Sequence, residues 1–214
     1  MKVGLLLSGC GMYDGTEISE AVLAMLALDR AGVQLVCVAP GLDQMHSVDH
    51  LTGEEVEGER RSVLGEAARL ARGKVQSLSD FWSGDLQALV IPGGYGAAKN
   101  LITGFMKLGA KREVIPEVRV LLDDLSSRRR PIGAISLGRA VLSAYFGGEM
   151  SEEDLALPAT QVTVDEERRV LFTPGFLTAA RISEAAKGID EMVASIVRMA
   201  AVGLPIIRQG ASCS

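Results

Sequence analysis

Hydrophobic residues along the chain alternate between short continuous runs and helical spacings. Runs of strand length occur at Lys2–Leu7, Gln34–Ala39, Ala88–Ile91 and Ile132–Ile135, and each stops at a proline or a small polar residue. Continuous apolar strands separated by helices are typical of a parallel sheet that helices cover on both faces. The pattern therefore predicts an α/β fold, with its ligand crevice beyond the carboxyl ends of the strands.

Helical spacing predicts the elements between and after these strands. In the first helix, Ile18, Val22, Met25 and Leu26 recur on one face, which we expect to be buried, and Ala31-Gly32 ends the helix. Further helices are predicted over 62–72, near 113–127 and from 182 to 197. The runs 162–164 and 170–173 flank a charged turn and predict an antiparallel hairpin at the sheet margin. We expect one domain over residues 1–204 and a loose tail over 205–214.

Composition restricts the classes of function. The 214 residues are 48% hydrophobic and 23% charged with a net charge of -5, and neither a basic block nor an aromatic-and-arginine stripe is present. These values argue against nucleic acid and membrane surfaces as partners. No apolar run is long enough to cross a bilayer. The cysteines Cys10, Cys37 and Cys213 are far apart and suggest neither a disulfide framework nor a zinc site, so we expect a reducing compartment and a cytoplasmic protein.

The most informative segment is Pro131–Ala140, which reads as a buried strand turning abruptly into a helix with Ser136 at the corner. This is the layout of a nucleophile elbow, in which the corner residue has strained backbone angles. Residues two before and two after must be small, as Ala134 and Gly138 are. No histidine follows Ser136, so the order required of an α/β-type serine hydrolase is missing.

Two other loops reach the same edge of the predicted sheet. The glycine turn Gly93-Gly94 and the N–H of Leu137 could donate to a developing oxyanion, although a tight turn without a ligand would use the same glycines. Nucleotide binding is disfavoured because neither GxxxxGK[ST] nor GxGxxG is present. Glu17 opens a helix, where its carboxylate either stabilises the helix start or faces the elbow with a raised pKa.

His46 and His50 form the remaining candidate cluster. Their spacing would suit a metal on a helix, but the stretch reads as a loop and no third ligand is evident. A local or dimer-interface hydrogen bond of His50 is the preferred interpretation. We expect no metal and no cofactor.

Several blocks together resemble one known family. Ser8–Ile18, Asp49–Gly53, Ala67–Gly73 and Pro92–Leu101, in this order, are similar to the ElbB family. These are class I glutamine-amidotransferase-like proteins of the ThiJ/PfpI superfamily, once linked to isoprenoid biosynthesis. The resemblance covers residues 1 to about 140 and Val164–Met199. It implies a flavodoxin-like three-layer sandwich, a homodimer, an elbow cysteine with a nearby glutamate, and weak glutathione-independent glyoxalase activity, also read as protein deglycation.

By this resemblance Glu17 stands at the family's glutamate and Ser136 at its cysteine. Gly93, Gly94, Leu137 and Asn100 are the expected oxyanion and substrate-binding residues. A serine hydroxyl needs an adjacent general base that a cysteine thiol does not, so the replacement predicts weak catalysis or none. The two hypotheses are a weakly active or non-catalytic protein that binds a small metabolite, and a glyoxalase or deglycase of small reactive carbonyls. A serine hydrolase is a distant third.

Overall fold

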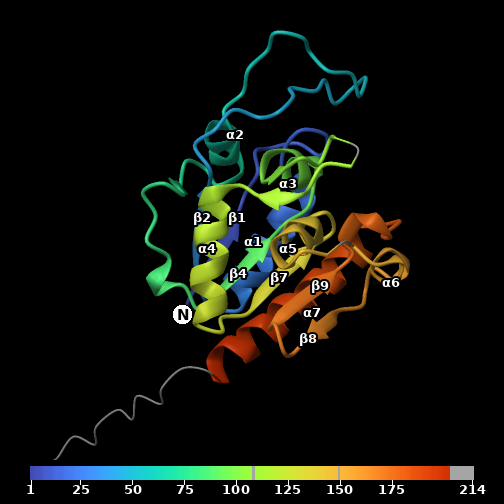
Figure 1. Ribbon diagram of the computed structural model, residues 1–214. Helices are drawn as coiled ribbons and strands as arrows, with labels where there is room; N and C mark the ends of the chain where they lie inside the picture. Colours follow the sequence, from blue (N-terminus) through green and yellow to red (C-terminus); the bar gives the residue numbers. More distant parts are fainter. Residues whose placement is uncertain (108, 149, 203–214) are drawn as a thin grey trace, which may run out of the picture.

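A seven-stranded sheet forms the middle layer of the molecule, as the computed structural model shows (Figure 1). The structure describes residues 1–107, 109–148 and 150–202. The strand order is β3-β2-β1-β4-β7-β9-β8, and all neighbours are parallel except β8 and β9. The strands are β1 Lys2–Leu6, β2 Gln34–Ala39, β3 Val75–Ser77, β4 Ala88–Ile91, β7 Ile132–Ile135, β8 Thr163–Asp165 and β9 Val170–Thr173.

Helices cover both faces of this sheet. One face packs against α1 Ile18–Arg30, α2 Val63–Leu70 and α7 Ile182–Val202, and the other against α3 Tyr95–Asn100, α4 Pro116–Ser127 and α5 Gly138–Phe146. The smaller elements are α6 Glu152–Ala156, the two-stranded hairpin β5 Ile102–Thr103 and β6 Glu113–Val114, and the 3-10 turns η1 Ser83–Asp85 and η2 Gly175–Leu177. The predicted flavodoxin-like three-layer α/β architecture is confirmed.

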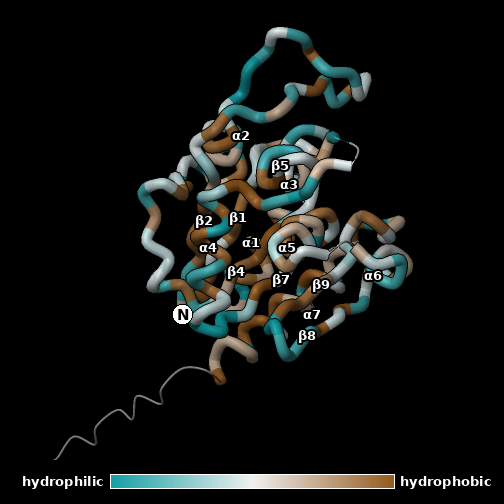
Figure 2. Tube along the Cα trace, viewed as in Figure 1, coloured by the Kyte–Doolittle hydropathy of each residue, from teal (hydrophilic) through white to brown (hydrophobic). Residues whose placement is uncertain are grey.

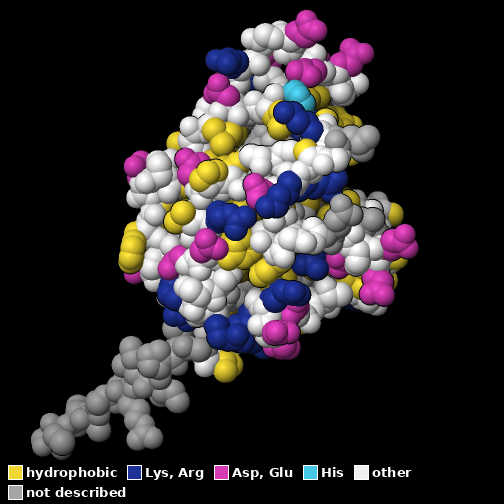
Figure 3. Space-filling model, viewed as in Figure 1, with side chains coloured by type: hydrophobic (Ala, Val, Ile, Leu, Met, Phe, Trp, Pro, Cys, Tyr) yellow, Lys and Arg dark blue, Asp and Glu magenta, His cyan; other side chains and the backbone are white. Residues whose placement is uncertain are grey.

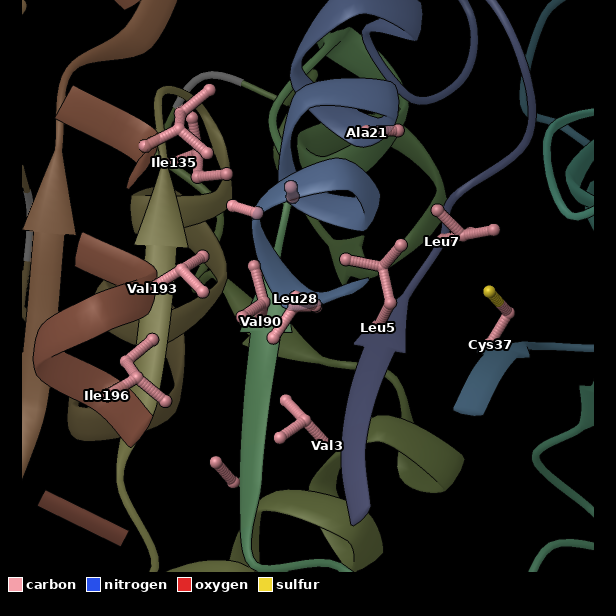
Figure 4. Close-up of a cluster of buried hydrophobic side chains, with 14 of the residues drawn as sticks. Val3, Leu5, Leu7, Ala21, Leu28, Cys37, Val90, Ile135, Val193 and Ile196 are labelled. Atoms are coloured by element: carbon pink, nitrogen blue, oxygen red, sulfur yellow. The ribbon is translucent and has the colours of Figure 1, made fainter. Parts of the chain in front are cut away.

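The two hydrophobic cores lie between these layers. Val3 and Leu5 of β1 face α1 and α7, where Figure 4 shows them with Leu28 and Ile196, while Leu6 points into the second core. Apolar colour follows the strands in Figure 2, and the long loop between β2 and α2 is largely hydrophilic. Since both faces of the sheet are covered, the central strands β4 and β7 are buried at every position.

The buried face of α1 is not the one that we predicted. Ile18, Val22 and Leu26 are 46%, 49% and 41% exposed, whereas Ala21 and Ala24 are fully buried. Small side chains on the inner face allow α1 to approach the sheet and α7 closely. The face prediction was therefore wrong for Ile18, Val22 and Leu26, which lie on the solvent side, whereas Leu28 is buried with the alanines.

Other sequence predictions hold to different degrees. β2, β4, β7 and β9 have the predicted bounds, and the expected hairpin is β8–β9. α4 begins at Pro116, not near 113, because residues 113 and 114 pair with β5. β3, α3, α6 and the β5–β6 hairpin were not predicted. The tail at 205–214 lies outside the described residues. Among the helices that the structure describes, none combines the length and apolar character required of a membrane span.

The strand order positions the candidate site. β1 lies between β2 and β4, so the sheet grows in opposite directions from the β1–β4 boundary, which is where open α/β sheets bind ligands. The loops after β1, β4 and β7 meet at this edge. The N–H of Glu17 donates to the carbonyl of Gly93 at 2.9 Å, and the N–H of Gly96 donates to the carbonyl of Gly15 at 2.9 Å.

Candidate active site

Ser136 lies at a strained corner between β7 and α5. Its φ is +52°, as the elbow predicts, and its side chain is 6% exposed. Its N–H donates to the carbonyl of Thr173 at 3.0 Å, and its carbonyl accepts from the N–H of Arg139 at 3.0 Å. A side chain at Gly138 would collide with the carbonyl of Ile91. The local fold therefore fixes the hydroxyl at the carboxyl edge of the sheet.

The carboxyl group beside this hydroxyl belongs to Glu20, on the first turn of α1. Glu20 is fully buried, and its two oxygens accept from the backbone N–H groups of Gly93, at 2.8 Å, and of Phe176, at 3.0 Å. A Cβ atom added to Gly93 would lie 2.6 Å from the carboxyl oxygen Oε2 of Glu20 and 2.8 Å from Oγ of Ser136. The two polar groups thus pack together over a glycine that must lack a side chain.

The third segment at this carboxyl is the turn η2. Gly175 has a φ of +52°, and a side chain there would collide with the carboxyl of Glu20. Glycine at this position allows the following N–H, that of Phe176, to reach Oε1. Three segments distant in sequence, around residues 20, 93 and 175, therefore enclose one acidic group.

The pKa of Glu20 is raised from 4.5 to about 7, mainly by burial and also by the neighbouring charge of Glu17. Hydrogen bonds from Phe176, Gly93 and Ser136 hold the pKa down, because they stabilise the ionised form. A carboxyl with this pKa gains and loses a proton near neutrality. Glu20 can therefore act as an acid or as a base towards a group held at Ser136.

Glu17 has the first of the two roles that the sequence left open, at the helix start, and not the position facing the elbow. It is the N-cap of α1, and its carboxylate accepts from the backbone N–H of Glu20. This is the role of a helix cap, in which the side chain satisfies a free amide of the first turn. Sequence reasoning named Glu17, whereas the geometry assigns the position beside Ser136 to Glu20.

Of the backbone amides expected to bind an oxyanion, one already donates to a side chain and two have no acceptor. The N–H of Gly93 is already bound by Glu20, so the expectation that it serves an oxyanion is corrected. In the described part of the chain, the N–H groups of Gly94 and Leu137 have no acceptor. Gly94 has a φ of +93° at the start of α3, and Leu137 precedes α5, so both amides lie on turns at the crevice edge. These two amides can bind an oxyanion or a carboxylate.

Asn100 supports the loops instead of facing a substrate. It is 4% exposed, and its amide nitrogen donates to the carbonyls of Ser8, at 2.9 Å, and Asp14, at 2.8 Å. Its oxygen accepts from the N–H of Met45 at 2.9 Å. Because both amide hydrogens are used, the predicted substrate contact of Asn100 is wrong.

His50 makes a local contact, one of the two roles expected for it. Its Nε2 accepts from the N–H of Tyr13 at 3.2 Å, and its ring centroid is 5.2 Å from that of Tyr13. Among the described residues, no three histidine, cysteine or acidic side chains gather where they could hold a metal ion.

The two cysteines that the structure describes disfavour their thiolate forms. Burial raises the pKa of the Cys37 thiol to about 11. Burial also raises the pKa of the Cys10 thiol, and the charges of Glu66 and Asp14 add to this shift while Arg69 opposes it. Thiolate nucleophiles require the opposite environment. Neither residue is an activated substitute for a cysteine at the elbow.

No family model matches the chain, but individual relatives do. The chain is 34% identical to an "ES1 protein homolog, mitochondrial" from Rattus norvegicus, over 92% of this chain and 84% of the rat protein. It is also 34% identical to the human "Glutamine amidotransferase-like class 1 domain-containing protein 3, mitochondrial", over 92% of this chain and 83% of the human protein.

Solved structures of other proteins are also similar to this chain. A crystal structure of an isoprenoid biosynthesis protein with an amidotransferase-like domain, from Ehrlichia chaffeensis, has a TM-score of 0.84 and 32% identity, over 92% of this chain and 99% of that one. A ThiJ/PfpI domain protein from Brachyspira murdochii, with a TM-score of 0.53 and 9% identity over 92% and 95% of the two chains, shares the fold.

These relatives overturn the cytoplasmic expectation, since the rat and human proteins are both named as mitochondrial. The expectation rested on unpaired cysteines, which indicate a reducing environment but do not tell one reducing compartment from another.

The similarity extends over nearly the whole chain and includes a structure with the same arrangement of elements, so the family is shown. The chain belongs to the ElbB-like and ES1 family of glutamine amidotransferase-like class 1 proteins, within the ThiJ/PfpI fold.

Proposed function

We propose that this protein binds a small carbonyl or carboxylate metabolite at the elbow and turns it over slowly or not at all. The observation that carries the proposal is the buried pair of Ser136 and Glu20, close to the open amides of Gly94 and Leu137. The amides suit a carboxylate or a carbonyl oxygen, and the pair offers one hydroxyl and one exchangeable proton.

We expect weak catalysis because Glu20 binds a proton far less strongly than an ionised serine hydroxyl does. Glu20, with a pKa of about 7, is the base that packs against Ser136. If a serine hydroxyl resembles water, with a pKa of roughly 15.7, its ionisation by Glu20 costs on the order of 12 kcal/mol. A thiol with a pKa of about 8.5 would need only about 2 kcal/mol. A cysteine at this corner would thus be activated by Glu20, whereas the serine is not.

The second candidate is a glutathione-independent glyoxalase or deglycase, the activity that the family resemblance implies. Glu20 favours it, because a carboxyl that exchanges a proton near neutrality could shuttle protons between the carbons and oxygens of a bound dicarbonyl. This activity would still require Ser136 to add to an aldehyde carbon without a strong base.

A comparison of three proteins separates these functions. The parent, Ser136→Cys and Ser136→Ala should be assayed for loss of glyoxal and methylglyoxal, and titrated with glycolate by calorimetry. We expect near-background turnover by the parent and by Ser136→Ala, and at least a hundredfold increase in Ser136→Cys. We also expect glycolate to bind to the parent.

Turnover by the parent that disappears in Ser136→Ala would establish the glyoxalase alternative and contradict the proposal. A parent that binds neither glycolate nor glyoxal would refute the binding function. Labelling of Ser136 by a fluorophosphonate probe would instead support a serine hydrolase.

A further inference from the structure

A large cavity lies away from the elbow, between the β5–β6 hairpin, the first turns of α4 and the end of α5. Its volume is about 920 Å³, within the range of cavities that hold small organic ligands. The elbow lies at the start of α5 and this cavity at its end, so the nine residues of α5 separate them by roughly 13 Å. The cavity is therefore distinct from the candidate active site.

The charges that line this cavity are mostly positive. Lys107, Lys111, Arg112 and Arg119 contribute to its wall, with Glu113 as the acidic residue among the described lining. Lys111 pairs with Glu113 at 2.6 Å. Lys107 and Arg119 form no ion pair with any residue that the structure describes. Figure 3 shows Lys and Arg side chains gathered over the middle of this face, although the whole chain has a net charge of -5.

Aromatic rings form the apolar part of the same wall. The guanidinium of Arg119 lies 5.7 Å from the ring centroid of Tyr145, and that of Arg112 lies 5.2 Å from the ring of Phe105. The Tyr145 hydroxyl donates to Asp123 at 2.7 Å, which fixes its ring. Arg119, which forms no ion pair with a described residue, can direct its N–H groups to an oxyanion while its guanidinium stays near the Tyr145 ring.

We propose that this cavity binds an organic phosphate, with the phosphate at Lys107 and Arg119 and an apolar body against Phe105 and Tyr145. The positive lining on an acidic protein attracts an anion, and the rings provide burial for a carbon skeleton. A purely structural role is the competing explanation, because cations near the carboxyl end of α5 also complement its helix dipole.

Calorimetric titrations with n-octyl phosphate, inorganic pyrophosphate and uncharged octyl glucoside test the proposal. The variants are Lys107→Gln and Arg119→Gln, with Arg60→Gln as a control for charge alone, since Arg60 lies on the distant exposed loop before α2. We expect octyl phosphate to bind, each cavity variant to weaken it at least fivefold, and Arg60→Gln to leave it unchanged. Pyrophosphate should bind more weakly with the same dependence on Lys107. Lys107 is exposed on the hairpin loop, so Lys107→Gln remains informative even if Arg119→Gln unfolds.

Several outcomes would overturn the proposal. The first is that octyl phosphate does not bind at millimolar concentration. The second is that uncharged octyl glucoside binds as tightly as octyl phosphate. The third is that Arg60→Gln weakens the binding of octyl phosphate as much as the cavity variants do. If the cations only stabilise the carboxyl end of α5, Arg119→Gln should lower the stability of the protein, while Lys107→Gln should leave the binding of octyl phosphate unchanged. Sedimentation with phosphatidylserine vesicles should leave the protein in the supernatant, and co-sedimentation that depends on Lys107 would identify a membrane surface instead.

Discussion

Replacing Glu20 with glutamine should remove a pH dependence of stability that the buried carboxyl creates. The pKa of Glu20 is about 7 in the folded protein, against 4.5 for the ordinary group. Between these values the folded state holds a proton that the unfolded chain releases, so the free energy of unfolding falls as pH rises. The shift of about 2.5 units corresponds to a decrease of about 3 kcal/mol between pH 4.5 and pH 7.

Glutamine cannot titrate, so the variant lacks this decrease. It also presents one acceptor where Glu20 presents two, which leaves the N–H of Gly93 or of Phe176 facing an amide NH2 at a constant cost of about 1–3 kcal/mol. The parent should therefore be clearly more stable than Glu20→Gln near pH 5. Its advantage should shrink through pH 6 and be nearly gone by pH 8.

Urea unfolding at pH 5, 6, 7 and 8 measures this difference directly. Glu17→Gln is the matched control, because it lies in the same turn and keeps an acceptor for the helix-cap hydrogen bond. It should retain the pH dependence, with the window moved slightly lower because the charge that raises the pKa of Glu20 is gone. A parent-minus-Glu20→Gln difference that is constant to within about 0.5 kcal/mol across this range would refute the reasoning, since Glu20 would then remain ionised throughout.

Three further substitutions test the surroundings of the site by the same unfolding measurement. Gly138→Val should destabilise the protein by about 3 kcal/mol or more, because the elbow has no room for a side chain. The control Gly148→Val, at a position in open space, should have little effect. Equal effects of the two substitutions would contradict the elbow packing. Gly175→Ala should lower the free energy of unfolding by about 1–3 kcal/mol because of its positive φ. It should also change the pKa of Glu20, and an unchanged pKa would show that the turn does not position the carboxyl. Asn100→Ala should lose about 2–4 kcal/mol, because three backbone groups lose their partner, and a loss below about 1 kcal/mol would mean that water replaces the amide.

The strands were predictable because burial on both faces leaves a local signature. A strand covered by helices on both sides is apolar at consecutive positions, and this pattern does not depend on which helix covers it. Ala88–Ile91 and Ile132–Ile135 have the predicted bounds for this reason. Strand β3, Val75–Ser77, lies at the edge of the sheet and has polar residues, so it had no comparable signature.

Glu17 was named from the family resemblance and from its place at the helix start, and the misassigned face of α1 gave no reason to consider Glu20 instead. Large apolar residues at Ile18, Val22 and Leu26 suggested the inward face, which would place Glu20 away from the core. The inward face consists instead of alanines and Leu28, and Glu20 lies on it at spacings of four and seven from Ala24 and Ala27. Size is a poor guide where a helix packs closely, since close packing selects small side chains. The alanine spacing was the signal that could have identified Glu20.

The remaining part of the site could not be read from local sequence at all. The N–H of Phe176 reaches the carboxyl of Glu20 across 156 positions of the chain, through a glycine that sequence inspection gave no reason to select. That contact affects chemistry as well as structure, because each backbone donor lowers the pKa of a carboxyl that burial alone would raise further. The proton affinity of Glu20 is therefore set jointly by α1, the turn after β4 and the turn after β9. A substitution in any of the three can change the acid–base behaviour at Ser136 without touching the hydroxyl itself.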